Sequence, residues 1–83
     1  MEHNLGNIEQ MLQDAEILYD SRTHENRVKA GMLYKEIIEN TDDPKHLSTA
    51  WLYLGMIVDQ RGDLEGAEFY YRTAMHYLSL IHI

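Results

Sequence analysis

Cysteine is absent from this chain of 83 residues, which excludes a disulfide framework, a thiolate nucleophile and a zinc–thiolate centre. Histidine is present, but no two histidines are four residues apart and no HExxH sequence occurs. Two of them fall at the expected starts of helices. We therefore expect no bound metal ion. The histidines are His3, His24, His46, His76 and His82.

The signature sequences of catalysis are missing as well. The chain contains no GxSxG, no P-loop and no GxGxxG sequence, and its five glycines do not cluster. The adjacent carboxylates of Asp42 and Asp43 lie in an expected turn, where helix capping explains them. We expect a protein that is not an enzyme and that needs no cofactor.

Basic residues are scarce. Lysine and arginine number seven against fourteen aspartates and glutamates, so the net charge is −7. The two halves of the chain share this charge almost equally. We expect no basic patch, and therefore no binding to nucleic acid or to an anionic membrane surface. A basic or neutral partner is easier to accommodate than an acidic one.

Long apolar runs are also lacking. No stretch reaches the roughly 18 uncharged apolar residues that a membrane span needs. The first ten residues lack the basic start and apolar run of a signal peptide. These absences predict a soluble, cytoplasmic protein. With 45% hydrophobic and 25% charged residues, residues 1–83 are expected to form a single globular domain.

The first half of the chain predicts two helices. Apolar residues repeat every 3.6 positions over residues 7–20, a segment that Asn7 would cap. A break follows, with Ser21 and Thr23 as possible capping residues. The spacing resumes over residues 24–40, which we expect to form the second helix.

The second half predicts two more helices. Asp43 suits the N-cap of a third helix and Pro44 its first position, where a missing N–H has no consequence. This helix is expected to cover residues 44–61. After a break at a glycine, Asp63 is expected to cap a fourth helix over residues 64–80.

The third and fourth helices carry a recognisable spacing of residues. It consists of Trp51, Leu54, Gly55 and Val58, followed by Ala67 and Tyr71. This spacing resembles the tetratricopeptide repeat (TPR) family, whose pattern is W-x2-L-G-x2-Y and then A-x3-F over about 34 residues. Valine and tyrosine replace the first and second aromatic residues. Because glycine inside a helix costs about 1 kcal/mol relative to alanine, we expect another helix to approach Gly55 closely.

An earlier segment resembles the same family less closely. Ala30 and Tyr34 match the second half of the repeat, and Leu12, Ala15 and Tyr19 would take the first-helix positions. The resemblance implies an all-α fold, in which two antiparallel helix–turn–helix hairpins stack as a short right-handed solenoid. The first repeat would span residues 7–43 and the second residues 44–81. Trp51 would then be buried between its own helix pair and the preceding pair.

TPR arrays present the first helices of their hairpins as a groove that binds a peptide or helix of another protein. By position, the resemblance assigns this groove to Thr49, Leu52, Met56, Asp59 and Gln60 in the second repeat and to Gln10, Gln13, Ile17 and Asp20 in the first. Of these residues, Leu52 and Met56 would give the strongest indication of a binding groove if they were exposed. The alternative is that both contact neighbouring helices. One TPR subtype clamps a terminal carboxylate with lysine, arginine and asparagine at such positions. The matching positions hold glutamine, aspartate, leucine and methionine, and the only cation at the end of a first helix is Arg61, so an acidic tail is not an expected ligand.

The expected fourth helix carries apolar residues both within its apolar stripe and outside it. Repeat arrays generally need about three units for stability, and this chain has two. We therefore expect a second copy, a longer parent chain or a partner to cover the self-association surface of Tyr70, Tyr77, Leu78 and Ile81. The aromatic residues near this surface suggest packing rather than a ligand cage; they are Tyr53, Phe69, Tyr70, Tyr71 and Tyr77.

These features predict a protein–protein interaction module that acts as an adaptor, scaffold or assembly factor. It would dock a peptide or helix of a partner protein on the TPR-like groove. The alternative is a structural unit that buries its last helix in a homo-oligomer, such as a homodimer, or in a longer repeat array.

Overall fold

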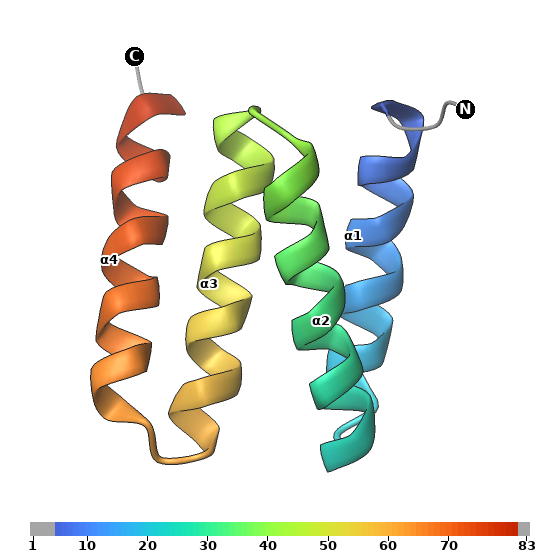
Figure 1. Cartoon of the computed structure of the whole chain (residues 1–83), viewed down its shortest axis with the longest axis vertical. Helices are drawn as coiled ribbons and strands as arrows, with labels where there is room; N and C mark the ends of the chain where they lie inside the picture. Colours follow the sequence, from blue (N-terminus) through green and yellow to red (C-terminus); the bar gives the residue numbers. More distant parts are fainter. Residues whose placement is uncertain (1–4, 82–83) are drawn as a thin grey trace.

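The computed structural model describes residues 5–81, which form four helices and no strand. These are α1 (Leu5–Asp20), α2 (His24–Asn40), α3 (Pro44–Gln60) and α4 (Leu64–Ile81). Figure 1 shows the helices following one another across the molecule in chain order, each antiparallel to the one before. The α1–α2 and α3–α4 turns lie at one end, and the α2–α3 turn lies at the other. The prediction of an all-α fold is confirmed.

Side-chain caps fix the starts of the last three helices. Thr23 Oγ1 accepts a hydrogen bond from a first-turn N–H of α2 at 3.1 Å. Asp43 Oδ1 accepts one from the Lys45 N–H at 2.9 Å, and Asp63 Oδ1 accepts one from the Gly66 N–H at 2.9 Å. Each cap satisfies an N–H that has no partner within its own helix. The predicted starts of these three helices are therefore confirmed.

The predicted start of the first helix was wrong. Helix α1 begins at Leu5, so Asn7 lies inside its first turn instead of capping it. Asparagine is tolerated within a first turn, and a capping-type residue does not by itself fix where a helix begins. The predicted end of this helix, at Asp20, agrees with the structure.

The core is formed mainly by the first three helices. Helix α3 packs against both α2 and α4, and α1 packs against α2 and touches α3. Helix α4 contacts only α3 among the described helices, which makes it an edge helix. The buried cluster comprises Ile8, Ala15, Ala30, Tyr34, Ile37, Ala50, Leu54 and Ile57. Ala67 and Ala74 are the buried residues of α4.

Gly55 allows α3 and α4 to approach closely. It is buried, and a Cβ atom added to it would stand 2.6 Å from Cε1 and 2.7 Å from Cδ1 of Tyr71. Real Cβ atoms do not approach other carbon atoms so closely, so the ring of Tyr71 occupies the space that a side chain would need. The predicted close approach of another helix at Gly55 is confirmed.

Trp51 is less buried than its position in the sequence pattern suggests. Its ring lies against two aromatic side chains of α4, with centroids 6.1 Å from Phe69 and 5.5 Å from Tyr70. Because α4 is the edge helix, Trp51 remains partly exposed. The largest fully buried side chains are those of Tyr34 and Ile37. The expectation that Trp51 is buried therefore holds only in part: its ring packs against the core cluster but is not fully buried.

Candidate partner-binding groove

An apolar groove lies between α3 and α4, and residues from both predicted surfaces line it. We refer to it as the α3–α4 groove; its volume is about 400 Å³. It is lined by Ser48, Thr49 and Leu52 of α3 and by Tyr71, Ala74, Met75 and Leu78 of α4. No charged residue belongs to this lining. The predicted binding residues Thr49 and Leu52 thus lie in one groove with Leu78, which was predicted for self-association.

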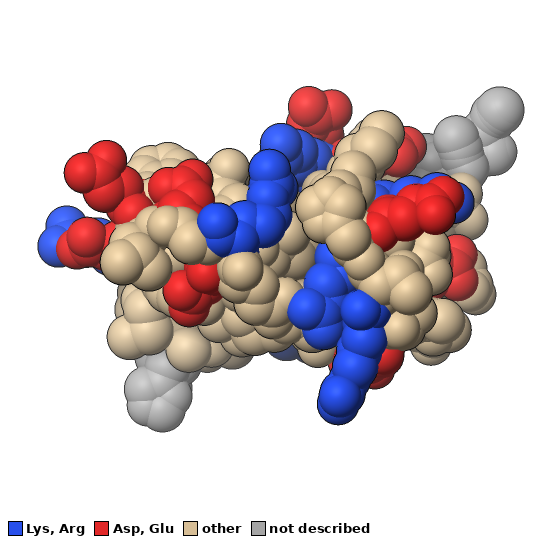
Figure 2. Space-filling view, turned by 90° about the horizontal axis from the view of Figure 1, so that it is seen from below, with Lys and Arg blue, Asp and Glu red and all other residues tan. Residues whose placement is uncertain are grey.

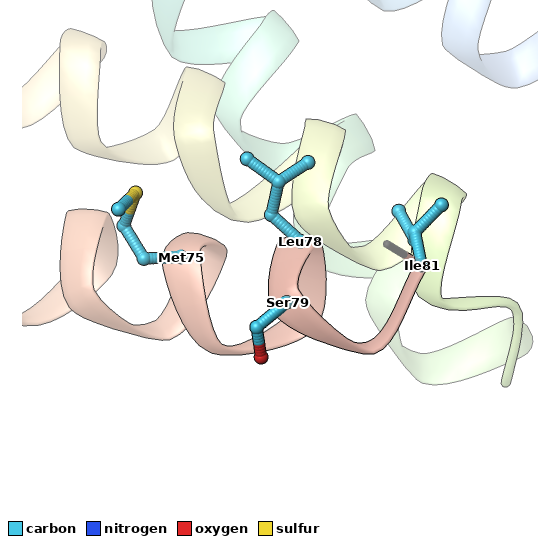
Figure 3. A pocket seen from close by; sticks show the side chains of 4 residues that line it. All are labelled: Met75, Leu78, Ser79 and Ile81. Atoms are coloured by element: carbon cyan, nitrogen blue, oxygen red, sulfur yellow. The ribbon is translucent and has the colours of Figure 1, made fainter. Parts of the chain in front are cut away.

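A second depression continues the apolar surface along α4. It is lined by Met75, Leu78, Ser79 and Ile81. Figure 3 shows Met75, Leu78 and Ile81 projecting from the same side of α4, while Ser79 points away from them. Because Met75 and Leu78 line both depressions, the two form one continuous strip.

Several apolar side chains of this strip are exposed to solvent. The exposed fraction is 43% for Leu52, 64% for Met75 and 51% for Leu78. Covering such surface stabilises a complex by roughly 25 cal/mol for each Å² of apolar area removed from water. Methionine adapts its shape to different ligands because its side chain is unbranched and polarisable. The strip can therefore bind an apolar surface of another molecule.

Two other predicted groove residues hold the helices together. Asp59 Oδ2 accepts a hydrogen bond from the Tyr71 hydroxyl at 3.2 Å, across α3 and α4. Burial raises the pKa of Tyr71, and the nearby Asp59 carboxylate raises it further. Gln60 donates to the Tyr19 hydroxyl at 2.5 Å and accepts a hydrogen bond from Arg27. Asp59 and Gln60 therefore make contacts between helices and lie outside the α3–α4 groove.

The other residues that were predicted to line the binding groove do not lie together in the structure. Met56 is half-buried and does not line the α3–α4 groove. Gln13 is exposed, and Ile17 is 68% exposed on α1, a helix that does not contact α4. Gln10, also on α1, donates a hydrogen bond to Asp14 at 3.0 Å. Position on the first helices alone does not define one continuous binding surface.

The predicted self-association residues also divide into two groups. Leu78 and Ile81 line the apolar strip, whereas Tyr70 and Tyr77 are half-buried and do not. Tyr70 packs on Trp51, and the ring of Tyr77 lies 5.2 Å from that of the neighbouring His76.

A tyrosine cluster that the sequence does not predict joins the first three helices. The ring of Tyr53 stacks on Tyr34 with centroids 5.0 Å apart and meets the edge of Tyr19 at 5.2 Å. Its hydroxyl donates a hydrogen bond to Glu16 at 3.0 Å. Burial raises the pKa of Tyr53 to about 12, and the hydrogen bond and charge of Glu16 add to this shift. No local pattern signals such a cluster because its members come from three helices.

The raised pKa of Tyr53 predicts a stability that falls at alkaline pH. Between pH 10 and 12 the unfolded chain loses this proton while the folded chain keeps it, so the free energy of unfolding decreases as pH rises. The Tyr53→Phe variant has no such proton and should show a shallower decrease. Urea unfolding followed by circular dichroism at several pH values in this window measures both slopes. Equal slopes for the two proteins would show that the pKa of Tyr53 is not raised in the folded protein.

Two further findings describe what residues 5–81 do not form. They contain no group of three or more histidine, aspartate or glutamate side chains placed to hold a metal ion. None of the helices among them is long and apolar enough to cross a membrane. His3 and His82 lie outside the described residues.

Comparisons of the chain with protein-family models, with curated proteins and with solved structures found no match.

Proposed function

We propose that this protein is a protein–protein interaction module, acting as an adaptor, scaffold or assembly factor. It docks an amphipathic helix of a partner protein in the α3–α4 groove. The observation that carries this proposal is the exposure of Leu52, Met75 and Leu78 around one groove without a charged lining residue. Exposed apolar patches of this kind often mark interaction sites, and a groove between helices suits the apolar face of a further helix.

We propose, in addition, that the two hairpins are TPR-like repeats stacked as a short right-handed solenoid. The order of helix contacts supports this arrangement, since each helix packs on the next and α1 also touches α3. The fit of Tyr71 over Gly55 supports it as well, because both positions belong to the family's pattern. In this arrangement the docking groove lies between the two helices of the second repeat.

The groove and the net charge define the chemistry of the partner. Leucine, isoleucine or methionine at positions i, i+3 or i+4, and i+7 would form the face of the partner helix that enters the groove. Basic or neutral residues are expected on its flanks because the chain carries a net charge of −7. The same charge disfavours nucleic acid and anionic membranes as partners.

Selection from a displayed library of helical peptides tests the proposal. We expect enriched peptides to share the apolar spacing described above, and Leu52→Asp to weaken their binding by about tenfold or more. Ile17→Asp is the matched control because it places the same charge on an exposed apolar position outside the groove. It should leave both the binding and the helical circular dichroism unchanged. An equal loss in both variants, or no enrichment at all, would exclude the α3–α4 groove as the docking site.

A second candidate function is self-association through α4. This helix carries six exposed large hydrophobic side chains: Leu64, Phe69, Met75, Leu78, Leu80 and Ile81. A second copy seated in the groove would cover part of them. Sedimentation equilibrium across a concentration series separates the two candidates. A dimer that dissociates on Leu78→Glu would favour the structural unit, whereas a monomer throughout would leave the groove free for another protein.

A further inference from the structure

Three arginines gather around one pocket at the end of the bundle where the α1–α2 and α3–α4 turns lie. Arg22, Arg27 and Arg61 line this arginine pocket together with His24, Gln60 and two apolar side chains; its volume is about 240 Å³. Figure 2 looks onto this end, where Lys and Arg side chains lie near the middle with Asp and Glu side chains among and around them. Counting charge along the chain does not predict this pocket, because residues far apart in the sequence converge here.

Arg27 is held in place by its surroundings. Its Nε–H donates to the Tyr19 carbonyl at 3.2 Å, and one of its terminal N–H groups donates to Gln60. The guanidinium carbon lies 4.5 Å from the centre of the Tyr19 ring. Two of the five N–H donors are thereby engaged, and the others are available to a ligand. A guanidinium fixed in this way loses little conformational freedom when a ligand binds.

Arg22 has an unusual backbone conformation. Its φ angle is +68°, and it is the sole residue other than glycine with a positive φ in the described part of the chain. Glycine or asparagine adopts this conformation more easily, and other side chains cost of order 1–3 kcal/mol there. Such a cost at a turn residue lining a pocket is consistent with a role for its side chain.

The pocket has no carboxylate in its lining to neutralise the arginines. Four acidic residues lie closest to these arginines along the chain. Glu25, Asp59 and Asp63 are engaged elsewhere, and the fourth is Asp20. Glu25 lies 3.8 Å from Lys29, and Asp63 caps α4 through the Gly66 N–H. At physiological ionic strength charges are screened over about 8 Å, so the acidic residues remote from the pocket contribute little to its potential. The first turn of α2, which includes His24, adds the positive end of a helix dipole.

We propose that the arginine pocket binds an oxyanion group, either a phosphate ester or a carboxylate. Arg27 supplies fixed donors, and Arg22 and Arg61 supply two further guanidinium groups, whose planar shape matches both anions. This site is independent of the α3–α4 groove, because the two linings share no residue.

Titration followed by ¹H–¹⁵N correlation spectra tests this site. The probes are inorganic phosphate and, separately, acetate, each added to the full chain at constant ionic strength. We expect saturable shifts at Arg22, His24 and Arg61, with millimolar dissociation constants. The double variant Arg22→Gln/Arg61→Gln should weaken binding by about tenfold, because it removes two sets of charge-assisted hydrogen bonds.

The matched control is Lys45→Gln/Arg72→Gln, which removes the same charge from residues outside the pocket lining. Its binding should remain within about twofold of that of the unaltered chain, as expected for small effects of distant surface charges. Saturation by phosphate alone would assign the site to phosphate esters, and saturation by acetate would extend it to carboxylates. Absence of saturation with both probes, or an equal loss in the control, would overturn the proposal.

Discussion

Replacing Tyr34 with alanine is expected to lower the free energy of unfolding by about 3–5 kcal/mol, the cost of truncating a large buried aromatic residue. Tyr34 is fully buried, and its ring stacks on Tyr53 with an angle of 9° between the planes. It belongs to the cluster in which α1, α2 and α3 meet. Small domains have only about 5–15 kcal/mol of stability, so this variant should be largely unfolded or melt far below the unaltered protein.

The Tyr34→Phe variant should behave in the opposite way. The Tyr34 hydroxyl is buried without a hydrogen-bond partner among the described residues, which costs about 1–3 kcal/mol. Phenylalanine keeps the stacked ring and removes this group, so the stability should be unchanged or higher. Thermal unfolding followed by circular dichroism measures both variants. A loss of more than about 1 kcal/mol for Tyr34→Phe would mean that the hydroxyl is bonded in solution.

The same substitution at two buried glycines is expected to have opposite effects. At Gly55 a Cβ atom would collide with the ring of Tyr71, so Gly55→Ala must displace that ring and weaken its hydrogen bond to Asp59. At Gly31 the nearest atoms, in the side chains of Ile57 and Leu54, would lie 3.8 and 3.9 Å away, at ordinary contact distance. Overpacking costs about 1–3 kcal/mol, whereas alanine in a helix is favoured over glycine by about 1 kcal/mol.

Gly55→Ala should therefore lower the free energy of unfolding, and Gly31→Ala should raise it. Because each kcal/mol shifts the melting temperature of a domain of this size by about 4–8 °C, the two variants should melt on opposite sides of the unaltered protein. Gly31→Ala serves as the control for the intrinsic helix preference of alanine. A higher melting temperature for Gly55→Ala would show that α3 and α4 are not in close contact at Gly55.

The helices could be predicted from the sequence because their ends depend on local chemistry. Thr23, Asp43 and Asp63 cap the residues that directly follow them, and Pro44 suits the first position of a helix. Such signals act within one helical turn, so the local sequence is enough to predict them. At α1 the predicted capping residue, Asn7, lies inside the first turn, and there the prediction was wrong.

The binding surfaces could be predicted only in part because they depend on which helix faces which. Periodicity placed Leu52 outside the core stripe, but only the position of α4 puts it beside Leu78 in a groove. Periodicity equally could not show that Gln60 reaches Tyr19 or that Trp51 lies at an edge.

The arginine pocket is the clearest example of what the sequence does not reveal. Its three arginines come from the α1–α2 turn, from α2 and from the residue that follows α3. Counting charge along the chain averages these residues with the acidic residues around them. The net charge therefore predicts which kind of partner the whole protein favours. It does not predict which ligand an individual pocket binds.

The central claim is that the α3–α4 groove receives a helix of another protein. The most direct test is a ¹³C-methyl spectrum of the protein, recorded with and without a peptide selected from the helical library. We expect the largest shifts at the methyl groups of Leu52, Met75 and Leu78, which line the groove. The methyl groups of Ile17 and Met32, which are exposed on α1 and α2, should not shift. Large shifts at these two residues, with the groove methyl groups unchanged, would contradict the claim that the α3–α4 groove receives the helix.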